Sequence, residues 1–219
     1  MTSRKITLIE ENIYISLILT FIGGFLDAYT YILYDQIFAN TQTGNIIFFT
    51  IFLVEGNIYN AFLRIFPIIS FCIAIFITQL LIHKFNENKK WIKIILLLNI
   101  ILTITIGTGI FKNISLIIVC LVSFICATMI GTFKKADGNV FAPTMCTGNL
   151  RSLMEFFSKW IIHKERESKK IVIKYISIIF TFCLGIAIGI ILVNILQNYS
   201  IYLCSLLFFI VFLIIKYKI

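Results

Sequence analysis

Long apolar runs divide this sequence and limit what it can fold into. The runs cover residues 13–34, 61–82, 92–111, 114–133, 171–196 and 201–215. A transmembrane helix needs about 20 mostly apolar residues. With 60% hydrophobic and only 13% charged residues, the chain also has too few polar residues for a soluble domain. The sequence therefore predicts an all-α membrane protein with six transmembrane helices in a single domain over residues 1–219.

Two polar segments interrupt the apolar pattern and resemble each other. The first break (residues 38–45) and the second break (residues 141–149) both begin with Phe-Ala and end with Thr-Gly-Asn. Each is followed by a segment too short to cross a bilayer, residues 46–54 and 150–162, which we interpret as a re-entrant half-helix. Unwound backbone at membrane depth is stable only where protein surrounds it or where it lines a water-filled cavity. Both breaks are therefore candidate binding sites.

The order of these segments predicts an internal duplication. Each half, residues 13–111 and residues 114–215, reads as a span, a break, a half-helix and two further spans. Three crossings per half make this a 3+3 inverted repeat, a class in which broken helices commonly form the substrate site near the midplane. The layout leaves only Arg64 and Lys112, of all the basic residues, on the side away from the N-terminus. Because basic loops stay in the cytoplasm, both termini are expected there.

Asp27 is the one carboxylate well inside a predicted span. An ionisable group at that depth is costly unless it is paired, solvated or functional. Asp27 could bind a cation or couple transport to protons. Alternatively, it could hold the first break in shape by accepting hydrogen bonds from the half-helix or by pairing with Arg64. Tyr31 and Tyr34, one and two turns further along, share its face and are candidates for lining the same cavity. The alternative is that they anchor the end of the span at the membrane interface, where Tyr is common.

The two Thr-Gly-Asn tripeptides supply further candidates for substrate binding: Thr43, Gly44, Asn45, Thr147, Gly148 and Asn149. Thr and Asn are good N-cap residues, so the tripeptides are expected to begin the half-helices. Gly allows a positive φ or a close approach of the backbone to a ligand. A helix N-terminus carries the positive end of a dipole and favours an anion. The alternative is that the tripeptides only cap the helices.

Gln42 and Arg151 lie beside the two tripeptides. Gln42 is a weaker candidate for the lining, as is Cys146 at the equivalent place in the second break. Arg151 could hold an anion near the second half-helix, or it could simply be a positive charge at the inner surface. No catalytic group, metal site or cofactor is expected, because the cysteines and histidines show no metal-ligand spacing and Cys146 has no neighbouring base.

These motifs resemble the YoaK-like family of bacterial polytopic membrane proteins, which is defined by a domain of unknown function. The resemblance rests on Gly-Gly-Phe-Leu-Asp-Ala-Tyr at residues 23–29 together with the first break, and on Thr-Met-Cys-Thr-Gly-Asn-Leu-Arg-Ser at residues 144–152. It covers essentially the whole chain. It implies a multi-pass protein of the bacterial inner membrane and implies no particular activity.

The function that we expect is that of a small-solute transporter or permease, not an enzyme. Its site would lie at the midplane between the two half-helix N-termini and would take a small anion or zwitterion. A channel, or a membrane protein with a structural or regulatory role and no transport, is the alternative. The expected partners are the lipid bilayer and the solute, because the net charge of +9 is attributed to cytoplasmic loops and not to nucleic-acid binding.

Overall fold

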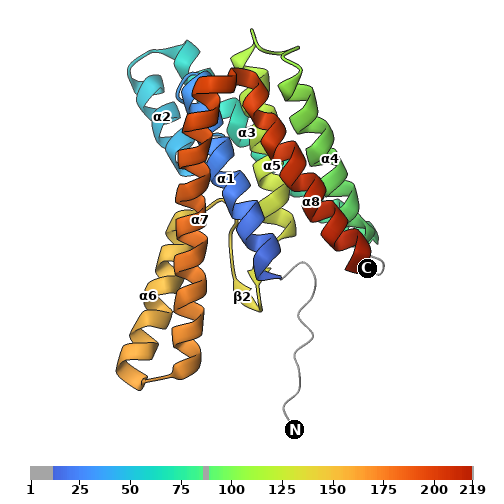
Figure 1. Ribbon diagram of the computed structural model, residues 1–219. Helices are drawn as coiled ribbons and strands as arrows, with labels where there is room; N and C mark the ends of the chain where they lie inside the picture. Colours follow the sequence, from blue (N-terminus) through green and yellow to red (C-terminus); the bar gives the residue numbers. More distant parts are fainter. Residues whose placement is uncertain (1–11, 86–88, 219) are drawn as a thin grey trace.

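The computed structural model describes residues 12–85 and 89–218, and Figure 1 shows a bundle of helices with one short hairpin. In chain order the elements are α1 (Ile13–Leu33), α2 (Gln42–Val54), α3 (Ile58–Phe85), α4 (Lys90–Gly107), α5 (Ser115–Thr132), β1 (Lys135–Ala136), β2 (Asn139–Val140), α6 (Cys146–His163), α7 (Arg166–Leu196), the 3-10 helix η2 (Gln197–Ile201) and α8 (Tyr202–Lys218). The long helices match the predicted apolar runs to within a few residues at most ends.

Five stretches of the described chain are long and apolar enough to cross a membrane: α1, α3, α4, α5 and residues Arg166–Tyr217, which contain α7, η2 and α8. Their outer surfaces are apolar. On α3, for example, Phe62, Phe76 and Leu80 are all more than half exposed. Such an exposed apolar surface is not stable in water and matches lipid tails. The chain is therefore a multi-pass membrane protein.

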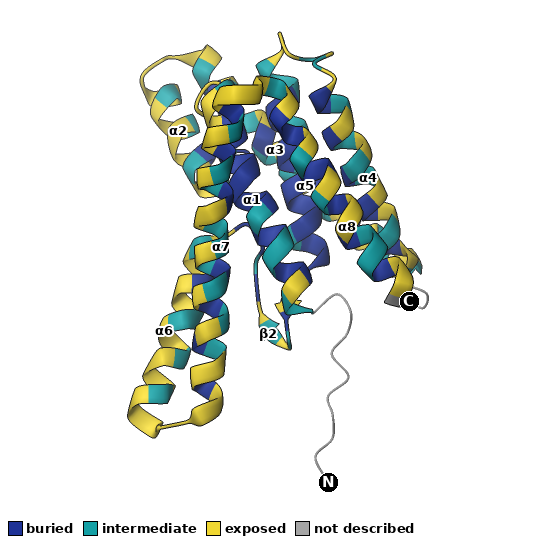
Figure 2. Cartoon of the chain, viewed as in Figure 1, coloured by how far each residue is buried: buried dark blue, intermediate teal, exposed yellow. Residues whose placement is uncertain are grey.

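α1 lies at the centre of the bundle, and Figure 2 shows its middle buried and its lower end partly exposed. It packs along α7, while α5 packs along α3 and α4 packs along α8. The contact between α1 and α7 is close because it is made at glycines: a Cβ on Gly24 would overlap the carbonyl oxygen of Phe182, and one on Gly185 would overlap the carbonyl oxygen of Phe21. Small residues let membrane helices approach through their backbones.

The helices that follow the two breaks, α2 with 13 residues and α6 with 18, lie at opposite ends of the bundle. In Figure 1, α2 occupies the upper end, where it packs on α3, and α6 occupies the lower end, where it packs on α7. Both begin four residues earlier than expected, at Gln42 and Cys146 instead of residues 46 and 150. The prediction was wrong here because it followed apolar residues, whereas the first turn of each helix is polar.

The segment between α5 and α6 contains a β-hairpin that the sequence did not lead us to expect. β1 and β2 pair antiparallel around Asp137 and Gly138, which both have positive φ. Lys174 of α7 donates to the Asp137 carboxylate at 2.7 Å. The hairpin thus connects the lower end of α5 to α7.

Candidate functional site

Asp27 lies on the buried face of α1, with 6% of its surface exposed. Both of its carboxylate oxygens accept hydrogen bonds from Asn40: Oδ1 from the backbone N–H at 3.3 Å and Oδ2 from the side-chain amide at 3.4 Å. Asn40 belongs to the first break, one residue before the N-cap of α2. Asp27 therefore holds the first break near α1. This agrees with the alternative that Asp27 keeps the break in shape by accepting hydrogen bonds.

Arg64 does not pair with Asp27, so that part of the expectation was wrong. Its guanidinium donates to the backbone carbonyls of Gln36 and Asp35, at 3.0 and 3.2 Å. Both of these residues have positive φ, in the turn after α1. The ion pairs between described residues join Arg151 to Glu155, Lys170 to Glu167 and Lys174 to Asp137, and none of them involves Asp27.

Asn40 also joins the first break to the second. The hydroxyl of Thr144 donates to Asn40 Oδ1 at 2.6 Å, and Asn40 Nδ2 donates to the carbonyl of Thr144. Both side chains are buried. They occupy the same place in their motifs, each three residues before the threonine of Thr-Gly-Asn. Two segments that are far apart in the chain thus meet through corresponding residues beside Asp27.

Asn45 and Asn149 each close their own break. Asn45 Nδ2 donates to the carbonyl of Phe38 at 2.9 Å, and Asn149 Nδ2 donates to the carbonyl of Ala142 at 3.0 Å, in both cases seven residues back. The expectation that the tripeptides supply the N-caps was wrong, because the caps are Thr41 and Met145 and neither forms a side-chain capping bond. The asparagines instead bind the approaching chain from inside the first turn.

Gln42 has a structural role in the same region. Its side-chain amide donates to the carbonyl of Ala39 at 2.8 Å and to Ser123 Oγ of α5 at 3.1 Å, and its Oε1 accepts from Asn45. Ser123 in turn donates to the carbonyl of Pro67 at 2.8 Å. The first break is therefore tied to α5 and α3 as well as to α1.

The Thr-Gly dipeptides lie on the surface. Thr43, Thr147 and Gly148 are exposed and Gly44 is partly buried. Both glycines are helical, and neither is among the residues with positive φ. A Cβ on Gly148 would meet nothing within 4 Å, and one on Gly44 would meet only the Thr41 methyl at 3.7 Å. Packing within the described chain therefore does not require glycine at either position.

A cavity of about 470 Å³ opens beside Asp27, between α1 and α7. Its lining is mostly apolar: Asp27, Ala28, Tyr31, Ile32, Phe38, Ile186, Ile190 and Asn194. Asp27 and Ala28 are buried, whereas Tyr31, Ile32 and Ile190 are about 40% exposed, so the cavity is closed at Asp27 and open at its rim. This volume is in the usual range for small-molecule sites, roughly 300–1,000 Å³.

Tyr31 lines this cavity, as its spacing from Asp27 predicts. Its ring stacks on that of Phe38 with 4.8 Å between the centroids. Tyr34 does not line it and donates to Asn198 Oδ1 at 2.7 Å instead. Arg151 also lies elsewhere: its side chain is 80% exposed and pairs with Glu155 at 2.8 Å.

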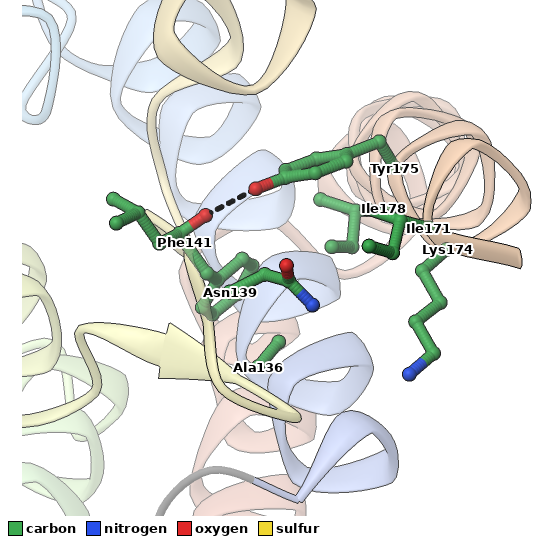
Figure 3. Close-up of a pocket in the computed structure, with 8 residues that line it drawn as sticks. Ala136, Asn139, Phe141, Ile171, Lys174, Tyr175 and Ile178 are labelled. Carbon is green, nitrogen blue, oxygen red and sulfur yellow. Dashed lines mark hydrogen bonds between the residues drawn. The ribbon is translucent and has the colours of Figure 1, made fainter. Parts of the chain in front are cut away.

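A second, smaller pocket lies between the hairpin and α7 and is shown in Figure 3. The labelled side chains Tyr175, Ile178 and Lys174 reach toward the hairpin, and the dashed line marks the bond from the Tyr175 hydroxyl to the carbonyl of Val140, at 2.5 Å. Its volume is about 10 Å³, which is about enough for one water molecule. This pocket is a packing site for the hairpin, and the cavity beside Asp27 is the candidate solute site.

Sequence reasoning missed Asn40, Thr144 and Asn194. For Asn40 and Thr144 a signal was present, because the two polar residues stand at corresponding positions of the duplicated motif. Asn194 carried no signal, since its role depends on the packing of α7 against α1. No cluster of three or more potential metal ligands occurs among residues 12–85 and 89–218.

The chain matches the family described as "Protein of unknown function (DUF1275)" over residues 15–214. No match was found among the curated proteins or among the solved structures.

Proposed function

We propose that this chain, which belongs to the DUF1275 family of proteins of unknown function, is a small-solute transporter of the bacterial inner membrane. One observation carries the proposal: the two breaks meet through Asn40 and Thr144, directly beside a buried carboxylate and a cavity of about 470 Å³. Polar backbone at membrane depth is costly, and its presence beside a cavity is typical of substrate sites in transporters.

The packing of the helices supports an inverted repeat of the 3+3 type. α1 of the first half packs on α7 of the second, and α5 packs on α3 in the same manner. The short helices follow this pattern, since α2 packs on α3 and α6 on α7. Counting α7 and α8 as separate crossings gives six, and α2 and α6 are then re-entrant half-helices that extend from the centre toward opposite surfaces (Figure 1).

The orientation follows from the basic residues. α1 begins and α8 ends at the lower end of the bundle in Figure 1, and the turn between α6 and α7 lies at the same end. This turn is rich in lysine and arginine, so the positive-inside rule assigns the lower end to the cytoplasm. The cavity beside Asp27 then opens toward the outer half of the membrane.

Catalysis is not part of the proposal. Cys146 is the thiol in the second break, and His163, at the far end of α6, is almost five turns away from it. A purely structural role for the Asp27–Asn40–Thr144 network is the competing interpretation, because all three residues also fix the shape of the breaks. Transport assays separate the two.

The test is uptake by the full-length protein in lipid vesicles. Wild-type vesicles are offered a mixture of small metabolites under a proton or sodium gradient, and the contents are identified by mass spectrometry. We expect at least one solute to accumulate, and we expect Asp27→Asn to abolish the accumulation that depends on the gradient. Asp35→Asn is the matched control, because Asp35 is exposed, lies outside the cavity and has a positive φ that Asn tolerates well.

Two results would contradict the proposal. The first is that no solute accumulates in wild-type vesicles whose protein is folded and correctly inserted. The second is that Asp27→Asn accumulates solute with the same gradient dependence as Asp35→Asn, which would leave Asp27 with a structural role only.

A further inference from the structure

We propose that the cavity beside Asp27 selects an organic cation, an ammonium group on an apolar body, and does not select an anion. This inference rests on the proposed transport function and names the substrate class of the same site. It differs from the expectation based on half-helix N-termini alone, which favoured an anion or a zwitterion. The difference comes from the residues that the fold brings together around the cavity.

The described lining of the cavity offers a carboxyl group and no cationic side chain to a ligand. Asp27 is the only charged residue among the described residues that line it, and the ion pairs of the described chain leave its carboxylate without a cationic partner. A carboxylate has about four acceptor positions, and Asn40 uses two of them at the long distances of 3.3 and 3.4 Å. A ligand with N–H donors can use the others.

An anion would meet like charge in this cavity. In a largely apolar environment the repulsion between two carboxylates is much stronger than in water. The positive end of α2 does not compensate for this, because no residue of α2 lines the cavity.

The walls fit a cation with an apolar body. Tyr31 and Phe38 contribute two aromatic rings. They stack on each other, which covers one face of each ring and leaves the outer faces to attract an ammonium group. Ile32, Ile186 and Ile190 contribute the apolar surface, and Asn194 adds a polar group at the α7 side. Most of the lining would thus contact the hydrocarbon part of the ligand, and the buried Asp27 carboxylate would fix the position of its ammonium group.

The test is binding of two probes of equal shape to the purified full-length protein in detergent. Phenethylammonium carries the cation, and 3-phenylpropionate carries a carboxylate on a phenyl body of the same size. We expect phenethylammonium to raise the unfolding temperature and 3-phenylpropionate to leave it unchanged, because a ligand that binds the folded state stabilises it. Calorimetry then supplies the affinity.

Two variants locate the binding. Asp27→Asn removes the charge, and Ile190→Trp fills the cavity at its exposed rim without a change of charge. We expect each to weaken the binding of phenethylammonium at least tenfold, with Asp35→Asn unchanged. Ile190→Trp lies on the surface, so it keeps the test decisive if Asp27→Asn does not fold.

The inference is overturned if 3-phenylpropionate binds more tightly than phenethylammonium, if neither probe binds, or if either variant binds phenethylammonium as the wild type does. Its failure can be distinguished from failure of the transport proposal. Uptake of an anion that depends on Asp27, without amine binding, overturns the inference and leaves transport standing. Amine binding that depends on Asp27, without uptake of any solute, supports the site and overturns transport.

Discussion

The first break and the second break share a framework but differ in their chemistry. In both, an asparagine in the first turn of the short helix donates to a carbonyl seven residues back. Of the two, only the first break hydrogen-bonds to a buried carboxylate and contributes a residue, Phe38, to the cavity of about 470 Å³. α5, which precedes the second break as α1 precedes the first, contains no acidic residue. The repeated residues thus determine the shape of the breaks, and an unrepeated residue supplies the charge.

Asn40→Ala should have the largest effect on this arrangement, because Asn40 is the one described residue that hydrogen-bonds to both Asp27 and the second break. The change leaves the Thr144 hydroxyl and Asp27 Oδ2 without their partners, while the backbone N–H of residue 40 still donates to Asp27 Oδ1, and we expect a loss of stability on the order of 3 kcal/mol. Unfolding in detergent measures it. Thr144→Val is the control and should cost less, since the Thr144 carbonyl still accepts from Asn40. Equal losses would contradict the central role of Asn40.

Arg64→Met tests an interaction next to the first break that does not involve the second break. Arg64 donates to the carbonyls of Asp35 and Gln36 and lies over the rings of Phe48 and Phe52, at 5.2 and 5.8 Å. Bonds from a charged donor are strong, so we expect a loss of about 2 kcal/mol. Lys112→Met, at an exposed lysine, provides the comparison and should change stability little. If both variants unfold alike, the turn after α1 does not depend on Arg64.

The pair Asn45→Ala and Asn149→Ala tests whether the framework is shared. Each variant removes one buried bond to a backbone carbonyl, so each should lose about 1–2 kcal/mol, by a similar amount in the two halves. Asn45 also donates to Gln42, which makes its loss the slightly larger one. The comparison fails if one asparagine can be replaced without cost while the other cannot.

The smallest effect is expected for Gly44→Ala and Gly148→Ala. Both positions are helical and have room for a Cβ, and Ala is favoured over Gly in a helix by about 0.5–1 kcal/mol. Both variants should therefore unfold at slightly higher temperature than the wild type. A loss of stability in either variant would contradict the open space around these two glycines. A loss of uptake at unchanged stability would show that solute reaches the tripeptide.

Much of the fold could be predicted from the sequence, because membrane spans depend on local composition. The bounds of α1 and α5 were predicted to within one residue. The segment after the first break is short, as predicted, with 13 residues in α2, whereas α6 has 18 residues and is as long as α4 and α5. Asp27 and Tyr31 were found because an acid inside a span is rare and one helical turn separates the two. The remaining lining residues could not be found in this way, since Ile186, Ile190 and Asn194 join the site only through the packing of α7 on α1. In a membrane protein both lipid-facing and buried positions are apolar, so hydrophobicity does not indicate which helices touch.

The glycine contact between α1 and α7 limits where side chains near the cavity can change size. Next to the cavity, Gly185 and Gly189 of α7 leave no space for a larger side chain against Phe21, Phe25 and Ala28 of α1. The positions at the rim, Tyr31, Ile32 and Ile190, are exposed and can change size without moving a helix. We therefore expect substrate preference to change through substitutions at the exposed rim, and not through larger side chains at Gly185 or Gly189.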